Sequence, residues 1–114
     1  SMSWVTRYFF PNGHIPSIAQ VGRAAERRVV VEDLHNFGAD YDRTLVAWEK
    51  RFRDSWPDIR ELSPAYDERF HRMWRYYLLS CAGAFRARHT QLWQWVLSPR
   101  GLPGGFRRPA LATA

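Results

Sequence analysis

The pattern of apolar and polar positions divides this chain into helical and strand-like segments. One apolar stripe at helical spacing predicts an amphipathic helix from about Ala39 to Ser55. The stripe consists of Tyr41, Leu45, Trp48 and Phe52. We expect Trp56-Pro57 to end this helix, because a proline disfavours helical geometry in the residue before it.

A second stripe predicts another helix, which begins at Ser63-Pro64 and ends near Arg88. Its buried side is expected to carry Phe70, Trp74, Tyr77, Leu78, Cys81 and Phe85. Ser63 is the candidate N-cap, and the carboxylates of Asp67 and Glu68 would lie near the positive end of the helix.

Two short runs predict strands, one from Arg28 to Leu34 and one from Gln91 to Leu97. The consecutive valines Val29 to Val31 favour a strand that is covered on both faces. Two strands alone are marginal as a sheet, so both are expected to belong inside a larger one.

The two ends of the chain differ in character. Trp4 to Phe10 is apolar and aromatic, and a turn signal follows it at Pro11-Asn12-Gly13. A short helix is expected from Ile15-Pro16-Ser17 to about residue 25. Residues 102–114 are rich in Gly, Pro and Ala and predict a flexible tail, while Ser1-Met2 is interpreted as an expression scar.

Composition narrows the function classes. The chain has 114 residues, enough for one small domain, and six Trp contribute to an aromatic content of 16% that needs a core or a partner to cover it. The net charge of +6 favours a phosphate-rich partner, either nucleic acid or an anionic membrane. Because arginines are spread along the predicted helices, a general or membrane-directed basic surface is preferred over nucleic-acid recognition.

Cysteine and histidine usage excludes several kinds of site. A single cysteine, Cys81, cannot form an internal disulfide framework and is typical of a reducing cytoplasm. The sequence shows no signal peptide and no apolar run long enough to span a bilayer. His35, His71 and His89 lack metal-ligand spacing, so no metal site is predicted.

The candidate site lies in the stretch from His35 to Leu45, where a strand turns through Gly38 into a helix. Such turns are where open α/β sheets place their ligand chemistry. Tyr41 brings a hydroxyl to a helix N-terminus, where free N–H groups favour an anion. The alternative is an aromatic side chain that packs on the core, and the sequence alone shows no nucleophile–base pair to complete a site.

Several segments resemble one known family in the same order along nearly the whole chain, from about Ser3 to Gly101. They are Tyr8–Gly13 with Ile15–Ser17, Glu32–Leu45 with Ala47-Trp48, Arg69-Phe70, Arg72–Trp74, Tyr76–Leu78, Cys81–Arg86 and Gln91–Gln94. With them the chain resembles the C-terminal part of the cyclopropane-fatty-acyl-phospholipid synthases, relatives of the mycolic-acid methyltransferases. The sequence Gly38-Ala39-Asp40-Tyr41 resembles the phospholipid-modifying branch, because the mycolic-acid branch tends to carry His before this Tyr.

The resemblance implies an α/β fold, a seven-stranded, Rossmann-like S-adenosylmethionine-dependent methyltransferase sheet. Residues 3–101 would be its C-terminal part, mostly helical, with 28–34 and 91–97 as the antiparallel sixth and seventh strands. It also implies transfer of a methylene group from S-adenosylmethionine to the cis double bond of an unsaturated phospholipid. A bicarbonate ion acts as the base, and Tyr41 matches one of its ligands. Tyr8, Phe9 and Phe10 would line an acyl channel, with ordinary core packing as the equal alternative.

The departures from the family pattern are large. The Gly-rich loop and the acidic residue that hold S-adenosylmethionine are absent, so no cofactor-binding residue is assigned and the isolated chain is expected to be inactive. The other bicarbonate ligands would also precede Ser3, and neither His35 nor Cys81 replaces them. The whole enzyme is expected to be cytoplasmic and peripherally bound at an anionic membrane, and the chain to form a homo-oligomer through the open edge of strand 91–97. A non-catalytic partner-binding module, or a basic module for nucleic acid or membranes, stays open as the alternative.

Overall fold

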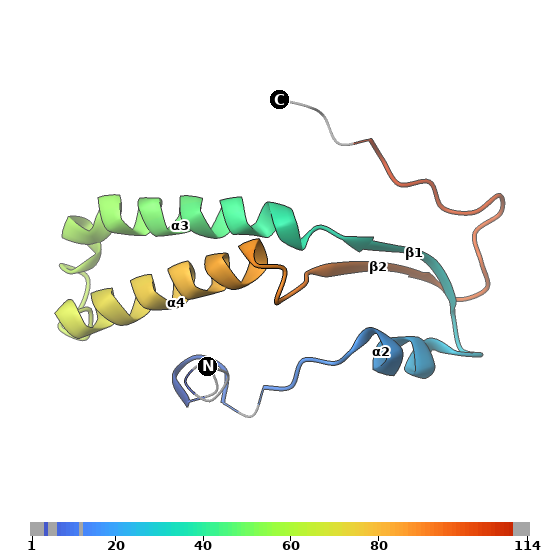
Figure 1. The fold of residues 1–114 in the computed structure, drawn as a ribbon, viewed down its shortest axis with the longest axis horizontal. Helices are drawn as coiled ribbons and strands as arrows, with labels where there is room; N and C mark the ends of the chain where they lie inside the picture. The colour runs from blue at the N-terminus through green and yellow to red at the C-terminus, as the bar shows by residue number, and fades with distance from the viewer. Residues whose placement is uncertain (1–3, 5–6, 12, 111–114) are drawn as a thin grey trace. The chain divides into compact units, whose positions relative to one another are not determined.

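The computed structural model describes residue 4, residues 7–11 and residues 13–110. Its regular elements in chain order are α2 (Ile18–Ala25), β1 (Val30–Asn36), α3 (Gly38–Ile59), α4 (Glu68–Arg86) and β2 (Trp93–Ser98) (Figure 1). The chain divides into two compact units, residues 1–35 together with 94–114, and residues 36–93. Across the described residues, no helix combines the length and the apolar character that a membrane span requires.

The expected mixture of helices with two antiparallel strands is confirmed, and the boundaries move by a few residues. The short helix begins at Ile18 because Ser17 caps it: the backbone N–H of Gln20 donates to Ser17 Oγ at 3.2 Å. The Gln20 side chain accepts in return from the Ser17 N–H at 2.7 Å, which completes a capping box.

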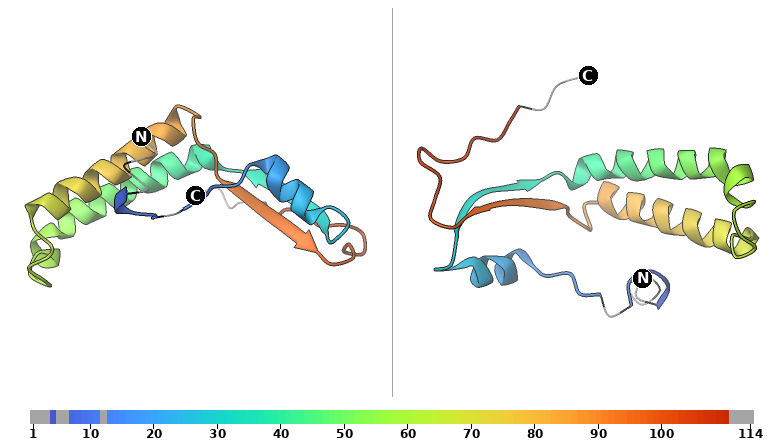
Figure 2. Two further views of the ribbon diagram at one scale, coloured as in Figure 1. Left: turned by 90° about the horizontal axis from the view of Figure 1, so that it is seen from below. Right: turned by 180° about the vertical axis from the view of Figure 1, so that it is seen from behind.

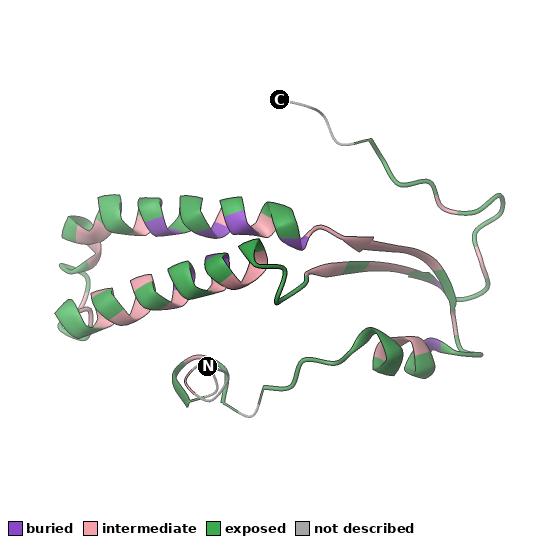
Figure 3. Ribbon diagram, viewed as in Figure 1, coloured by how far each residue is buried: buried purple, intermediate pink, exposed green. Residues whose placement is uncertain are grey.

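The second unit is a hairpin of α3 and α4, which lie side by side in every view (Figures 1 and 2). Its core consists of Leu45, Leu78 and Ala82, each 3% exposed. The buried positions of both helices face one another along the hairpin (Figure 3). The packed partners around this core are Tyr41, Phe52, Trp74, Tyr77, Cys81 and Phe85, all of them members of the apolar stripes seen in the sequence.

The predicted end of the first long helix at Trp56-Pro57 is wrong. α3 continues to Ile59 with Pro57 inside its last turns, and the N–H of Arg60 still donates to the carbonyl of Trp56 at 3.0 Å. Pro57 has no N–H to donate to the carbonyl of Arg53, so α3 continues past it without that hydrogen bond. Packing of Trp56 against Phe52, with ring centroids 5.6 Å apart, favours one further turn.

The predicted start of the second long helix at Ser63 is also wrong. Ser63 instead closes a turn, since its Oγ accepts from the N–H of Ala65 at 3.2 Å. α4 begins at Glu68, and its N-cap is Asp67, four residues after the proposed cap; Asp67 Oδ1 accepts from the N–H of Phe70 at 2.9 Å. Both residues are sound N-cap types, and only the tertiary arrangement selects Asp67.

The first unit contains an antiparallel pair of β1 and β2. Contrary to the expectation of strands covered on both faces, Val30 and Val31 are 42% and 43% exposed, and Leu97 is 46% exposed. Among the described residues the sheet has two strands, so each strand has one hydrogen-bonded neighbour. Val30, Val31 and Leu97 are side chains typical of a strand inside a sheet. The described residues do not bury them.

The segment after β2 carries no regular helix or strand over residues 99–110, yet it is attached to β1. The Leu102 N–H donates to Glu32 Oε1 at 2.8 Å, and the Arg108 guanidinium donates to both carboxylate oxygens of Asp33. The predicted flexibility of residues 102–114 stays a prediction, and residues 111–114 lie outside the described residues.

Candidate functional site

The turn from β1 into α3 builds the candidate site. The N–H of Phe37 donates to the carbonyl of Leu92 at 3.1 Å, which continues the pairing of the two strands to the first residue of the turn. Asn36 Oδ1 then accepts from the N–H of Gly38 at 3.2 Å and so satisfies one free donor of the helix start. The Phe37 side chain makes no capping hydrogen bond, so Asn36 provides the cap.

Gly38 is required by the closeness of the facing chain. A Cβ atom at this position would lie 3.1 Å from the backbone nitrogen of Leu92, 3.2 Å from Phe85 Cδ1 and 3.3 Å from the Cα of Gln91. Two of these three neighbours are backbone atoms that cannot rotate away. The glycine in the sequence turn therefore lets α3 begin in direct contact with the residues that lead into β2.

Tyr41 lies in the first turns of α3, where its ring is held by two aromatic neighbours. Its centroid is 5.7 Å from that of Trp48 and 5.1 Å from that of Phe85, at interplanar angles of 80° and 73°. Edge-to-face pairs of this kind fix the ring orientation. Tyr41 is half-buried and its side chain packs against the core of Leu45, Leu78 and Ala82, while its role toward a ligand stays a prediction.

Two further polar groups lie close to Tyr41. Burial raises the pKa of Tyr77, and the neighbouring Cys81 and Tyr41 raise it further. Burial also raises the pKa of the Cys81 thiol, and the hydrogen bond from Tyr77 only partly offsets this effect. Tyr77 and Cys81 therefore keep their protons at neutral pH, and Cys81 is not an activated nucleophile.

The start of α3 is tied to the end of α4 by a two-pronged ion pair. Asp42, 9% exposed, accepts from Arg86 Nε at 2.8 Å and from Nη2 at 3.2 Å. The same contact raises the pKa of Arg86. Because Asp42 follows Tyr41 directly, this pair fixes the helix turn that presents the Tyr41 hydroxyl.

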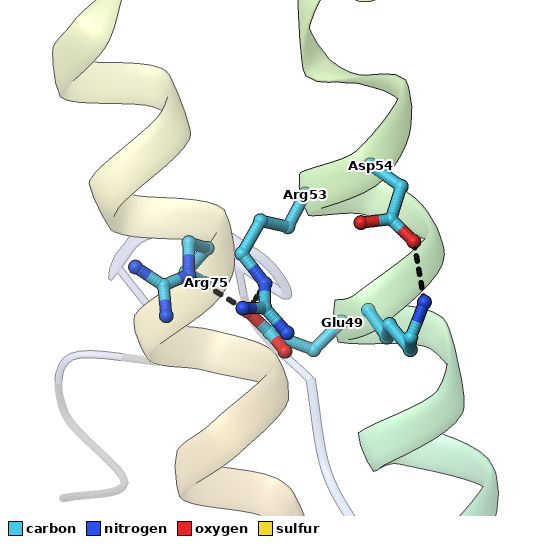
Figure 4. Close-up of polar contacts among 5 residues, drawn as sticks. Glu49, Arg53, Asp54 and Arg75 are labelled. Carbon is cyan, nitrogen blue, oxygen red and sulfur yellow. Dashed lines mark hydrogen bonds and ion pairs between the residues drawn. The ribbon is translucent and has the colours of Figure 1, made fainter.

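A second buried carboxylate, Glu49, lies between the helices (Figure 4). It is 5% exposed and accepts from Arg75 Nε of α4 at 2.8 Å. Arg53, one turn along α3, lies 3.4 Å from the same Glu49 oxygen. Nearby, Lys50 donates to Asp54 at 2.6 Å, but both side chains are largely exposed, so this pair matters less than the buried one.

The far half of the hairpin is filled by a series of ring contacts. Centroid separations run from 4.5 Å for Trp56–His71 to 6.5 Å for Phe52–Trp74. The other members of this series are Tyr66, Phe70 and Tyr77. His71 stacks here and lies 3.4 Å from Glu68, which gives it a structural place rather than a metal-binding one.

The remaining predicted site residues lie in the first unit. Tyr8 and Phe10 are 38% and 56% exposed, and Phe9 packs on Trp4 with centroids 5.3 Å apart. Their role in an acyl channel stays a prediction. Within the described part of the chain, no three His, Cys, Asp or Glu side chains are grouped as metal ligands would be.

Sequence reasoning missed Asp42 and Glu49 as buried carboxylates. Both stand on the apolar stripe side of α3, at the i−3 and i+4 positions from Leu45. Acidic residues at such positions could have signalled pairing with arginines of the facing helix, and Arg75 and Arg86 of α4 are the partners that the structure shows.

Comparison with known proteins agrees with the sequence resemblance. Residues 1–95 match the protein family described as mycolic acid cyclopropane synthetase. The chain belongs to this family. Its relatives include the cyclopropane-fatty-acyl-phospholipid synthase of Escherichia coli strain K12, which is 55% identical over 104 residues.

Two further relatives differ from the E. coli protein in their identity to this chain and in the share of their length that is matched. The cyclopropane-fatty-acyl-phospholipid synthase of Citrobacter freundii is 56% identical over 90 residues, which are 79% of this chain and 97% of that sequence. Cyclopropane mycolic acid synthase 2 of Mycobacterium leprae is 29% identical over 99 residues, 84% of this chain and 30% of that protein. The match to the E. coli protein includes 91% of this chain but only 26% of that protein. The chain therefore spans about a quarter of the length of that enzyme.

Proposed function

We propose that the chain is the C-terminal part of a cyclopropane-fatty-acyl-phospholipid synthase. The complete enzyme transfers a methylene group from S-adenosylmethionine to the cis double bond of an unsaturated phospholipid. The identity of 55% to the E. coli synthase, against 29% to the M. leprae mycolic acid synthase, supports a phospholipid rather than a mycolic acid as substrate. The remaining strands of a seven-stranded methyltransferase sheet would come from outside these residues.

Within this function, Tyr41 is the residue that we assign to the reaction, as a ligand of bicarbonate. The observation that carries the assignment is its placement: a half-buried phenol in the first turns of α3, its ring held by Trp48 and Phe85. A phenol O–H can donate a hydrogen bond to an anion, and the helix N-terminus favours negative charge there. Tyr8, Phe9 and Phe10 are assigned to the acyl channel by resemblance alone.

S-adenosylmethionine is not assigned to any residue of this chain. The acidic and Gly-rich elements that hold it in the family have no counterpart in the sequence, and the two buried carboxylates of α3 are paired with arginines, Asp42 with Arg86 and Glu49 with Arg75. The cofactor would supply the methyl group, while Tyr41 would bind and orient the bicarbonate base.

We expect the 114-residue chain by itself to bind no S-adenosylmethionine and to convert no phospholipid, whereas the complete protein does both. Calorimetry measures the first property, and mass spectrometry of unsaturated phosphatidylglycerol vesicles measures the second. Stoichiometric cofactor binding by the chain alone would contradict our placement of the cofactor site. If the complete protein left the acyl double bonds unchanged, the proposed function would be wrong.

The same vesicles test the membrane proposal. The net charge of +6 supports peripheral association with anionic lipid. Association of the complete protein would then weaken as salt rises, because salt screens exposed charges. Equal binding to neutral and anionic vesicles would remove this electrostatic contribution.

We also propose that the isolated chain self-associates through the open edge of strand 91–97. β2 pairs with β1 on one side, and a strand with a free row of backbone groups recruits another chain. Light scattering is expected to give the mass of a dimer or larger assembly, with Trp93 or Trp95 at or near the contact. A stable monomer at high micromolar concentration would contradict this proposal.

A basic binding module for nucleic acid is the second candidate function. It would need aromatic rings interleaved with arginines on an exposed face. In the described residues most rings of the hairpin instead pack against one another or the Leu45 core. The observations therefore favour the enzyme.

A further inference from the structure

The segment that follows β2 is attached to one strand in particular. Its ordered contacts begin at Gly101, whose N–H donates to Ser98 Oγ at 3.0 Å, and they end at Arg108. Between these residues its partners in β1 are Glu32, Asp33 and the backbone of Leu34. We call residues 101–108 the strap.

The first half of the strap contacts one carboxylate, that of Glu32. Glu32 Oε1 accepts from Ser98 Oγ at 2.7 Å and from the N–H of Leu102 at 2.8 Å. Gly104 and Gly105 have φ of 77° and 81°, and the Gly105 N–H donates to the Leu102 carbonyl at 2.8 Å. These positive φ angles require glycine, so the turn around Glu32 is encoded in the sequence Pro103-Gly104-Gly105.

The second half of the strap holds both the side chain and the main chain of β1. Arg108 Nε donates to Asp33 Oδ2 at 2.9 Å, and Nη2 donates to Asp33 Oδ1 at 2.8 Å. Nη2 also reaches the Leu34 carbonyl at 3.3 Å. A guanidinium that binds a carboxylate through two nitrogens has one fixed orientation, so the contact is directional as well as charged.

The two anchors lie on opposite faces of the strand. Successive side chains of a β-strand point to opposite sides, so Glu32 and Asp33 place one carboxylate on each face of β1. The strap therefore holds β1 from both sides. β1 also carries the exposed valines Val30 and Val31, which make an uncovered strand prone to pair with another chain.

We propose that the strap guards β1 against strand addition by a second copy of this chain, so that self-association is confined to β2. Proteins protect edge strands by covering them with a loop or by placing charge along them, and the strap does both. The strap itself, residues 101–108, lies beyond the family-model match, which ends at residue 95, while its partners Glu32 and Asp33 lie within that match. The proposal depends on the proposed self-association in one respect only, namely that β2 is the strand through which two copies pair.

The test uses the complete 114-residue chain with Arg108→Asp, which replaces the attraction to Asp33 by repulsion. Arg107→Asp is the matched control. It changes the net charge by the same amount at the neighbouring position, and Arg107 takes no part in the contacts to β1. The double variant Asp33→Arg with Arg108→Asp restores an ion pair with its signs exchanged. Amide hydrogen exchange of residues 30–36 and 102, and the mean mass from light scattering, are measured for all four proteins.

In Arg108→Asp we expect exchange at these amides to be about threefold faster, as suits the loss of an exposed ion pair. We expect the mean mass to rise about twofold or more, because a second strand becomes open to pairing. Arg107→Asp should match the wild type, and the double variant should return toward it.

Unchanged exchange in Arg108→Asp would overturn the strap, and faster exchange with an unchanged mean mass would overturn its guarding role. An equal effect of Arg107→Asp would show that net charge, not the clasp, is responsible. A monomeric wild type with an associating Arg108→Asp variant would refute the proposed β2 pairing and support the strap.

Discussion

In the complete protein, Tyr41→Phe is expected to convert unsaturated phospholipid about tenfold to hundredfold more slowly than the wild type. The variant removes one hydroxyl that we assign to a bound anion, and a hydrogen bond to a charged group is worth about 1.5–3 kcal/mol. The phenylalanine ring keeps the contacts with Trp48 and Phe85, so folding should be unaffected. Turnover is measured by mass spectrometry of vesicle lipids, and the affinity for S-adenosylmethionine is measured in parallel.

Tyr76→Phe is the matched control for this variant. Tyr76 lies on α4, is 55% exposed and loses the same single atom. It should retain wild-type turnover. Wild-type turnover in Tyr41→Phe as well would return Tyr41 to a packing role, and a large loss of cofactor affinity would assign it to the cofactor rather than to the base.

The largest expected effect on stability belongs to Arg75→Ala. This change leaves Glu49, 5% exposed, without its 2.8 Å partner, and a buried carboxylate that loses its donor is strongly penalised. Because the Arg75 side chain is itself 39% exposed, we expect a loss of about 1–3 kcal/mol in the free energy of unfolding rather than the value for a fully buried pair. Urea denaturation followed by tryptophan fluorescence measures it.

Arg53→Ala provides the comparison from the same cluster. Arg53 contacts the same oxygen at 3.4 Å from an adjacent turn of α3, and its side chain is 54% exposed. Its loss should cost less than about 1 kcal/mol. A double-mutant cycle of Glu49→Ala with Arg75→Ala isolates the coupling between the two residues. Equal effects of the two arginine variants would mean that Glu49 is effectively solvated.

Local signals in the sequence were sufficient for the elements and for the position of Tyr41. The apolar stripes of α3 and α4 reappear as the surroundings of Leu45, Leu78 and Ala82, because helical periodicity is a property of the backbone alone. The glycine turn before Tyr41 was correctly placed for the same reason. Tyr41's assignment to bicarbonate depends on the family resemblance and stays a proposal.

Choices between equally good local signals could not be made from the sequence. Ser63 and Asp67 are both capable N-caps, and Pro57 can end a helix or sit within its last turns. The structure decides both cases: α4 is capped by Asp67, and α3 continues past Pro57 to Ile59. The prediction that β1 and β2 are buried on both faces likewise depended on neighbouring elements, and the local sequence pattern does not show which elements those are.

The sequence by itself determined the two long helices, the two strands and the glycine that begins the candidate site, since each depends on residues close together in the chain. The family followed from motifs spread in order along the chain. Only the tertiary structure decided which charges meet. Glu49 finds Arg75 across 26 positions, Asp42 finds Arg86 across 44, and Asp33 finds Arg108 across 75. Seventeen basic and eleven acidic residues allow many such pairings, and the tertiary arrangement of the elements selects the few that form.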